Sequence, residues 1–455
     1  MSLENAVLPL EILELILDEI ERSRQYNEKE VQETLQTCSF VCYAFRSRAY
    51  RHLFSTLQLI QHPFSSPSKL LTKLWDLREL VHAGHQLGLP SILHYTRSFQ
   101  LVMDGSVFDA YAILENEDLA RIMRILCKYS SVLHTIAIAG SFIPIFWPDL
   151  SREFQEAFRD LTRVPTVTTL RLNNISGVPA NILHGTNIDH VKFHLVKSFY
   201  PMLAHWPFFC MFHTDQLRAL DIDYTFPIAQ PSNVEPVEEL DPLFSQVGSS
   251  FSGVKSLQYT FYHPEDFQRL MNVASSLPSL ESVVINYSNS TSSLFEGLGY
   301  DVPFDTLSSL RTLGICHKSD IAVGIRSPLL KVADLLTCID VPPSLETLIL
   351  GFVVRTTPPW LRLAEYFPEP KAWGLLDKLL VSERYSSVRS VQLRLQYVTL
   401  PGKPWSFDED VFLRRCWACL EDVFPLVMSS KTKTLEVDVA VFPLGRNVDI
   451  LDFGI

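Results

Sequence analysis

One six-residue pattern, apolar-x-x-apolar-x-apolar, occurs nine times along this chain and constrains its fold more than any other feature. The last two apolar positions of each copy alternate with a variable position, which is typical of a short strand with one buried face. A helical stretch and a turn precede most copies. The copies begin at Leu133, Val167, Ile188, Leu217, Val254, Leu280, Leu310, Leu345 and Val388.

The spacing of these copies resembles that of an irregular array of leucine-rich repeats. Each strand would turn its apolar side chains inward under a connecting helix, and no unit could bury them without its neighbours. Starting positions 21 to 43 residues apart require longer helices or insertions in several units. We therefore expect an α/β solenoid with a parallel, concave sheet over residues 61–455. A doubly wound sheet also alternates strands and helices, but nine copies of one template favour stacked units.

Weaker signals extend this array at both ends. The pairs Phe99/Leu101 and Leu435/Val437 repeat the final alternation of the template, and residues 55–59 alternate in the same way. Apolar residues at helical spacing predict amphipathic helices over residues 69–89 and 408–428.

The first 60 residues follow a different pattern. They contain Leu-Pro-x-Glu-Ile-Leu-x-x-Ile-Leu from Leu8, Thr-Leu-x-x-Cys-Ser-Phe-Val-Cys from Thr34, and Arg-His-Leu-Phe from Arg51. This order of motifs resembles the F-box of a group of proteins common in mushroom-forming fungi. The resemblance implies a small helical domain over residues 1–60 that docks on the Skp adaptor and, through it, on a cullin. The polar insert at residues 21–33 departs from the family pattern.

The first predicted helix carries more apolar residues than one buried face needs. Leu13, Ile16, Leu17 and Ile20 form one stripe at helical spacing, while Leu8, Ile12 and Leu15 form a second. One stripe can pack on the next helix, which leaves the other for a partner. With the family motif, this predicts adaptor-binding residues at Leu8, Pro9, Ile12, Leu13, Ile16, Cys38, Val41 and Phe45.

The sequence contains no motif of a catalytic, phosphate-binding or dinucleotide-binding site. Cys416 and Cys419 have the spacing of a redox or zinc pair, but no second pair accompanies them, so we interpret them as packing residues. The pairs His82/His85, His190/His194 and Asp221/Asp223 also lack further ligands nearby in the sequence. We therefore expect no enzyme activity, no cofactor and no metal site.

Net charge, hydropathy and cysteine content indicate which kinds of partner and which cellular compartment to expect. A formal net charge of −12 argues against nucleic acid. No signal peptide or membrane-spanning segment is evident, so no membrane partner is expected. Eight cysteines in 455 residues do not form a disulfide framework, which predicts a cytoplasmic or nuclear location.

Together these features predict a substrate-recognition subunit of a Skp–cullin–F-box ubiquitin ligase, whose repeat sheet binds a target protein. The alternative is a protein-binding repeat protein or scaffold with no role in ubiquitination. In either case the variable positions between the apolar strand residues would contact the target. These predicted substrate-binding residues are Arg171, Asn173, Lys192, His194, Asp221, Asp223, Gln258, Gln392 and Arg394.

Overall fold

The structure is a computed structural model that forms two compact units, Met1–Gln216 and Leu217–Ile455. It describes residues 10–22, 28–61, 66–86, 92–103, 106–140, 145–176, 178, 180–196, 217–225, 252–261, 270–271, 273–275, 277–288, 304–319, 328–356, 370–399 and 424–443. Among these, no helix is long and apolar enough to cross a membrane.

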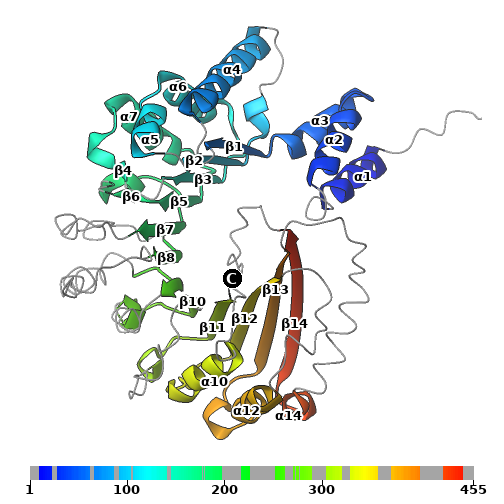
Figure 1. Ribbon diagram of the computed structural model, residues 1–455, viewed down its shortest axis with the longest axis vertical. Coiled ribbons are helices and arrows are strands. Elements are labelled where there is room, and N and C mark those ends of the chain that lie inside the picture. Colours follow the sequence, from blue (N-terminus) through cyan, green and yellow to red (C-terminus); the bar gives the residue numbers. More distant parts are fainter. Residues whose placement is uncertain are drawn as a thin grey trace, which may run out of the picture. The chain divides into compact units, whose positions relative to one another are not determined.

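The first unit begins with three helices and continues as alternating strands and helices (Figure 1). Its helices are α1 (Leu10–Arg22), α2 (Glu28–Cys38), α3 (Tyr43–Leu53), α4 (Pro67–Gln86), α5 (Val107–Leu114), α6 (Glu117–Tyr129) and α7 (Arg152–Thr162). Its main strands are β1 (Thr56–Gln61), β2 (Ser98–Met103), β3 (Thr135–Ala139), β5 (Thr169–Asn173) and β7 (His190–Val196). The short strands β4 (Ile145–Phe146) and β6 (Ile175–Ser176) pair with each other.

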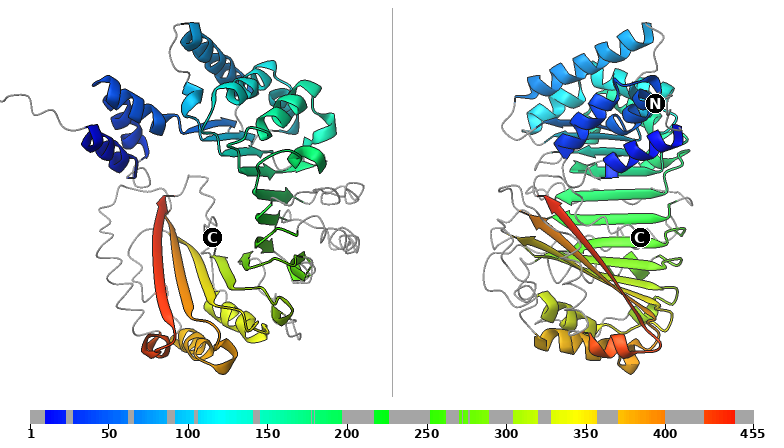
Figure 2. Two further views of the ribbon diagram at one scale, coloured as in Figure 1. Left: turned by 180° about the vertical axis from the view of Figure 1, so that it is seen from behind. Right: turned by 90° about the vertical axis from the view of Figure 1, so that its right-hand side faces the viewer.

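The second unit contains the strands β8 (Ala219–Thr225), β9 (Ser256–Phe261), β10 (Ser282–Ser288), β11 (Thr312–Ser319), β12 (Thr347–Thr356), β13 (Ser390–Thr399) and β14 (Thr434–Pro443). Its helices are α10 (Pro328–Cys338), α12 (Pro370–Leu380) and α14 (Pro425–Ser429), which lie next to one another in every view (Figures 1 and 2). All three helices begin with proline, whose missing N–H has no helical partner at that position.

The main strands are parallel and follow chain order in each unit, β1-β2-β3-β5-β7 in the first and β8 to β14 in the second. Every predicted copy of the template contains a strand, and so do the weaker signals at residues 55–59, 99–101 and 435–437. A doubly wound sheet reverses its strand order at its centre; the described strands of each unit show no such reversal.

The apolar positions of the template align across the strands without any shift in register. In the first unit Ile136 pairs with Leu170, and in the second Leu313 pairs with Leu348. These residues and the first apolar residue of each of their templates are buried. The register therefore stacks each apolar layer on the next, and each strand completes the core of its neighbour.

A recurring backbone contact fixes this register where each strand begins. The carbonyl of the residue just before one strand accepts hydrogen bonds from two successive amides at the start of the next. The carbonyl of Arg97 accepts from His134 at 2.7 Å and Thr135 at 3.1 Å, and that of Glu281 accepts from Arg311 at 2.7 Å and Thr312 at 3.0 Å. The contact needs no particular side chain, so its positions are free to vary.

In the second unit, the side chains of the residues just before β9 and β10 form an ion pair. Lys255 Nζ lies 2.6 Å from Glu281 Oε1, one strand away, and this contact, together with the charge of Arg311, lowers the pKa of Glu281. Both side chains are largely exposed, so the pair contributes little to stability.

Buried polar groups tie the last described helices together. Both carboxylate oxygens of Asp377, on α12, accept hydrogen bonds at 2.9 Å from the backbone amides of Leu426 and Val427, which caps α14. Lys433 Nζ donates to the carbonyls of Tyr385 and Val388 at 2.6 and 2.7 Å, and burial lowers its pKa. The Asp377 bonds fix α14 to α12, and the Lys433 bonds fix the residue directly before β14.

The predicted helix at residues 69–89 is α4, Pro67–Gln86. Most of the helix predicted at 408–428, including Cys416 and Cys419, lies outside the described residues. At its C-terminal end the structure has the short helix α14, which extends to Ser429.

The strands β10 and β11 pack closely at Gly314. A Cβ atom at Gly314 would lie 2.8 Å from Cγ2 of Val284, its partner in β10, and both residues are buried. We expect Gly314→Ala to lower the free energy of unfolding by about 1–3 kcal/mol because it overpacks this contact. Thermal unfolding by calorimetry measures the effect.

The double variant Gly314→Ala/Val284→Ala is the control for this prediction. Removing the Val284 methyls makes room for the new Cβ, so the two changes together should cost less than the sum of the single changes. Additive costs would contradict the packing explanation.

Candidate protein-binding surfaces

Helices α1, α2 and α3 form a small bundle, hereafter the helical module (Figure 1). Its core consists of Leu17 from α1 with Val31 and Leu35 from α2, all buried. The partly buried side chains of Ile20, Cys38, Phe45 and Leu53 pack against this core. The module thus closes its own apolar centre with one side of each helix.

A charged cluster fixes α1 to α3 beside this core. Arg48 donates to Asp18 through Nε at 2.8 Å and through Nη2, and His52 Nε2 lies 2.8 Å from Asp18 Oδ1. The contact with Arg48 lowers the pKa of Asp18 to about 2, against the opposing effect of burial, and His52 adds to the lowering. Asp18 is 30 residues from Arg48 and 34 from His52, and no sequence motif predicts their contact.

The module leaves several large apolar side chains exposed. On α1, Ile12, Leu15 and Ile16 share one side at helical spacing, and Leu15 is 59% exposed. In and after the turn that joins α2 to α3, Phe40 is 80%, Val41 66% and Tyr43 79% exposed. Exposed apolar side chains are unremarkable singly, but groups of them are typical of interaction sites.

This arrangement changes the interpretation of the predicted adaptor-binding residues. Ile12, Ile16 and Val41 are exposed and could contact a partner directly. Cys38 and Phe45 instead pack against the core of the module. Leu8 and Pro9 lie outside the described residues, and for Leu13 the structure describes only the backbone, within α1.

The expected grouping of α1 residues into two stripes was wrong at Ile16. Helical spacing grouped Ile16 with Leu17 and Ile20, yet Leu17 and Ile20 face the core while Ile16 is exposed together with Ile12 and Leu15. The reason is that the helix turns 100° per residue, so Ile16 lies at the border between both stripes. Phe40 and Tyr43, which are not among the predicted adaptor-binding residues, are more exposed than Ile12, Ile16 and Val41, which are.

The predicted substrate-binding residues of the first unit lie side by side on β5 and β7. The register pairs Arg171 with Lys192 and Asn173 with His194. Arg171, Asn173 and Lys192 are half-buried, and for His194 the structure describes only the backbone. The strands thus bring these four positions together.

In the second unit, one of the corresponding positions is not exposed. Asp221 is only 4% exposed, so the prediction that it is a surface residue was wrong; its neighbour Asp223 is described only as part of β8. Gln258 and Gln392 are half-buried. Gln392 donates to Glu436 at 3.1 Å and accepts from Arg394 at 3.0 Å, which forms a polar row across β13 and β14.

The central strands of the second unit are buried on both faces. Val284, Cys316 and Ile349 occupy positions that alternate with the apolar template residues, and none is more than 3% exposed. A parallel strand covered on both sides carries apolar residues continuously, as Val283–Ile285 and Leu348–Leu350 do. At β10, β11 and β12, the positions that alternate with the template residues are therefore not an exposed face of the sheet.

Two observations on the described residues bear on metal and thiol chemistry. No three His, Cys, Asp or Glu side chains among them are placed to hold a metal ion. Burial raises the pKa of the Cys127 and Cys316 thiols to about 12, which keeps both protonated at neutral pH. His82 lies 3.0 Å from the side-chain amide of Gln86.

Comparisons with known proteins add little to this picture. No protein-family model matches the chain, and no curated protein does. Among solved structures it is similar to human 5T4, also called Wnt-activated inhibitory factor 1 or trophoblast glycoprotein. That similarity has 14% sequence identity and a TM-score of 0.28, and covers 53% of this chain and 76% of the other. At this score it carries no argument.

The Asp18 cluster predicts how the helical module responds to acid. Because the pKa of Asp18 is lowered from 3.8 to about 2, its contribution is present above pH 4 and disappears as the pH falls towards 2. We expect Asp18→Asn to lower the stability of the module at pH 7 by about 1–2 kcal/mol. Hydrogen exchange of α1 and α3 at a series of pH values measures this.

Asp76→Asn, an exposed substitution on α4, is the matched control and should leave that exchange unchanged. If wild type and Asp18→Asn lost protection in parallel between pH 4 and pH 2, the role given to Asp18 would be refuted.

Proposed function

We propose that this chain is a substrate-recognition subunit of a Skp–cullin–F-box ubiquitin ligase. The helical module would dock on the Skp adaptor, and the strands that follow would hold a target protein. The observation that carries the proposal is the set of exposed apolar side chains on a module that has already closed its own core. The order of the F-box-like motifs in Leu8–Phe54 gives that surface a specific partner.

The module geometry supports docking through α1 and the turn before α3. Ile12, Leu15 and Ile16 form a continuous apolar side of α1, which a partner helix or groove could cover. Val41 would add to that contact from the turn. Burying side chains of this size in an interface supplies affinity without any charged contact.

The parallel strands support the further proposal that residues 61–455 form a leucine-rich-repeat-like solenoid. Strands in chain order, apolar template positions in register and helices beside them are what stacked repeats require. The partly exposed strand positions at Arg171 and Lys192 would then contact the target. No catalytic group is needed, because a ligase subunit acts by raising the effective concentration of its target near the charged enzyme.

One observation favours a second candidate, a protein-binding repeat protein whose helical module is only a cap. The Tyr50 ring of α3 lies edge to face with the Tyr95 ring, with centroids 6.3 Å apart. The module therefore packs against the segment that leads into β2. A cap in this position has a structural role without any adaptor.

Adaptor binding separates these two functions. We expect Leu15→Asp to reduce co-purification of the Skp adaptor with the full chain at least tenfold, because it places a charge in the apolar contact. Leu80→Asp on α4 is the matched control, since Leu80 is 55% and Leu15 59% exposed and both lie on helices. Circular dichroism should show that both variants remain folded.

Retention of the adaptor by Leu15→Asp would contradict the docking surface, and no adaptor binding by the wild-type chain would favour the cap. If the adaptor binds as proposed, proximity labelling with a chain that lacks residues 1–60 should trap the target, because recognition would continue without ubiquitination.

A further inference from the structure

A groove of about 660 Å³ lies between α4 and α6 in the first unit. Its apolar lining comes from Val81 on α4, which is buried, and from Ile125 on α6, which is partly exposed. Four cationic side chains line the same groove, and they are Arg78, Arg121, Arg124 and Lys128. Glu79 is the one carboxylate among the groove's lining residues.

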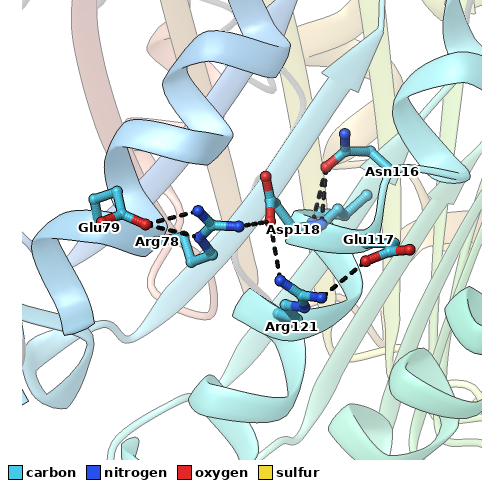
Figure 3. Close-up of polar contacts among 7 residues, drawn as sticks. Arg78, Glu79, Asn116, Glu117, Asp118 and Arg121 are labelled. Atoms are coloured by element: carbon cyan, nitrogen blue, oxygen red, sulfur yellow. Dashed lines mark hydrogen bonds and ion pairs between the residues drawn. The ribbon is translucent and has the colours of Figure 1, made fainter.

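Carboxylates already neutralise two of these cations. Arg78 Nη1 donates to Asp118 at 2.7 Å and Nη2 donates to Glu79 at 2.6 Å (Figure 3). Arg121 donates to Glu117 at 2.8 Å and lies 3.8 Å from Asp118. This network fixes α4 against the first turn of α6 and leaves little positive charge at that end of the groove.

Arg124 and Lys128, unlike Arg78 and Arg121, are not paired with a carboxylate among the described residues. Both are exposed and lie four residues apart on one side of α6, and neither forms a hydrogen bond or ion pair with a described residue. Lys128 Nζ lies 4.9 Å from the centre of the Tyr129 ring. The charge of Arg124 contributes to a lowered pKa of Glu156 on α7, but that carboxylate is bonded to Arg152. Like charges at this spacing repel each other, and an anion between them would relieve the repulsion.

We propose that this groove binds an acidic peptide segment of a partner protein. Carboxylates of the segment would meet Arg124 and Lys128, and an apolar side chain beside them would lie against Val81 and Ile125. A chain with a net charge of −12 and two uncompensated cations in the groove is poorly suited to a nucleic acid, which requires many phosphate contacts. The groove involves neither the helical module nor the strands, so the inference is independent of the proposed function.

A charge-reversal variant tests the groove directly. The probe is a short fluorescein-labelled peptide of alternating Glu and Leu, titrated against the full chain and followed by fluorescence anisotropy. We expect Arg124→Glu/Lys128→Glu to weaken binding at least tenfold, because it reverses both uncompensated charges. Binding of the wild type should also weaken as salt is added.

The matched control is Lys69→Glu/Lys73→Glu on α4. It makes the same change in net charge, at the same spacing, on exposed side chains that do not line the groove. Its affinity should stay within about twofold of wild type, since the remaining effect is long-range and screened. Equal losses in both double variants would overturn the proposal, as would equal binding of a peptide with Lys in place of Glu.

A second measurement uses only the wild-type chain. Addition of the Glu-Leu peptide should slow hydrogen exchange at residues 78–86 and 117–129 and leave α1 unchanged. Protection confined to other segments would overturn the groove as the site. Stronger protection of α6 by a single-stranded oligonucleotide than by the peptide would overturn the choice of an acidic peptide.

Discussion

The register between adjacent strands is the constraint on which the rest of this structure depends. Each strand presents two apolar side chains to a layer that its neighbours must complete, so the core exists only while Leu170 stays beside Ile136 and Leu348 beside Leu313. A slip of one residue would turn both positions to the opposite face. A backbone contact opposes such a slip. Two successive amides at the start of each strand donate to the carbonyl just before the neighbouring strand, as His134 and Thr135 do to Arg97, and this fixes where the new strand begins.

This constraint explains where the chain can vary. The segments between strands need only return the chain to the edge where the next strand starts, so the helices differ in length and number. They also differ in how they are joined: Asp377 on α12 caps α14. The strand core tolerates less change. Gly314, for example, lies against Val284 with no room for an added Cβ. Candidate surfaces for partners therefore include the helices as well as the strands.

The helical module and the α4–α6 groove provide two such surfaces with different chemistry. The module has a complete core and additional apolar side chains, which suits a stable, largely apolar contact. The groove combines two uncompensated cations with apolar walls, which suits a weaker and salt-dependent contact. The two surfaces share no residue, so a partner on one does not depend on a partner on the other.

The sequence by itself determined the strands, because alternation within a six-residue template depends only on local spacing and burial of one face. It also located the helical module and most of its apolar residues. Only the tertiary structure decided which of those residues are exposed: Ile16 is exposed while Cys38 and Phe45 pack inward, since the packing of three helices sets the border between core and surface. It likewise buried Asp221 and covered both faces of β10 to β12. The Asp18–Arg48 cluster and the cationic groove were not predicted either, because their members come from helices that are adjacent in space and distant in sequence.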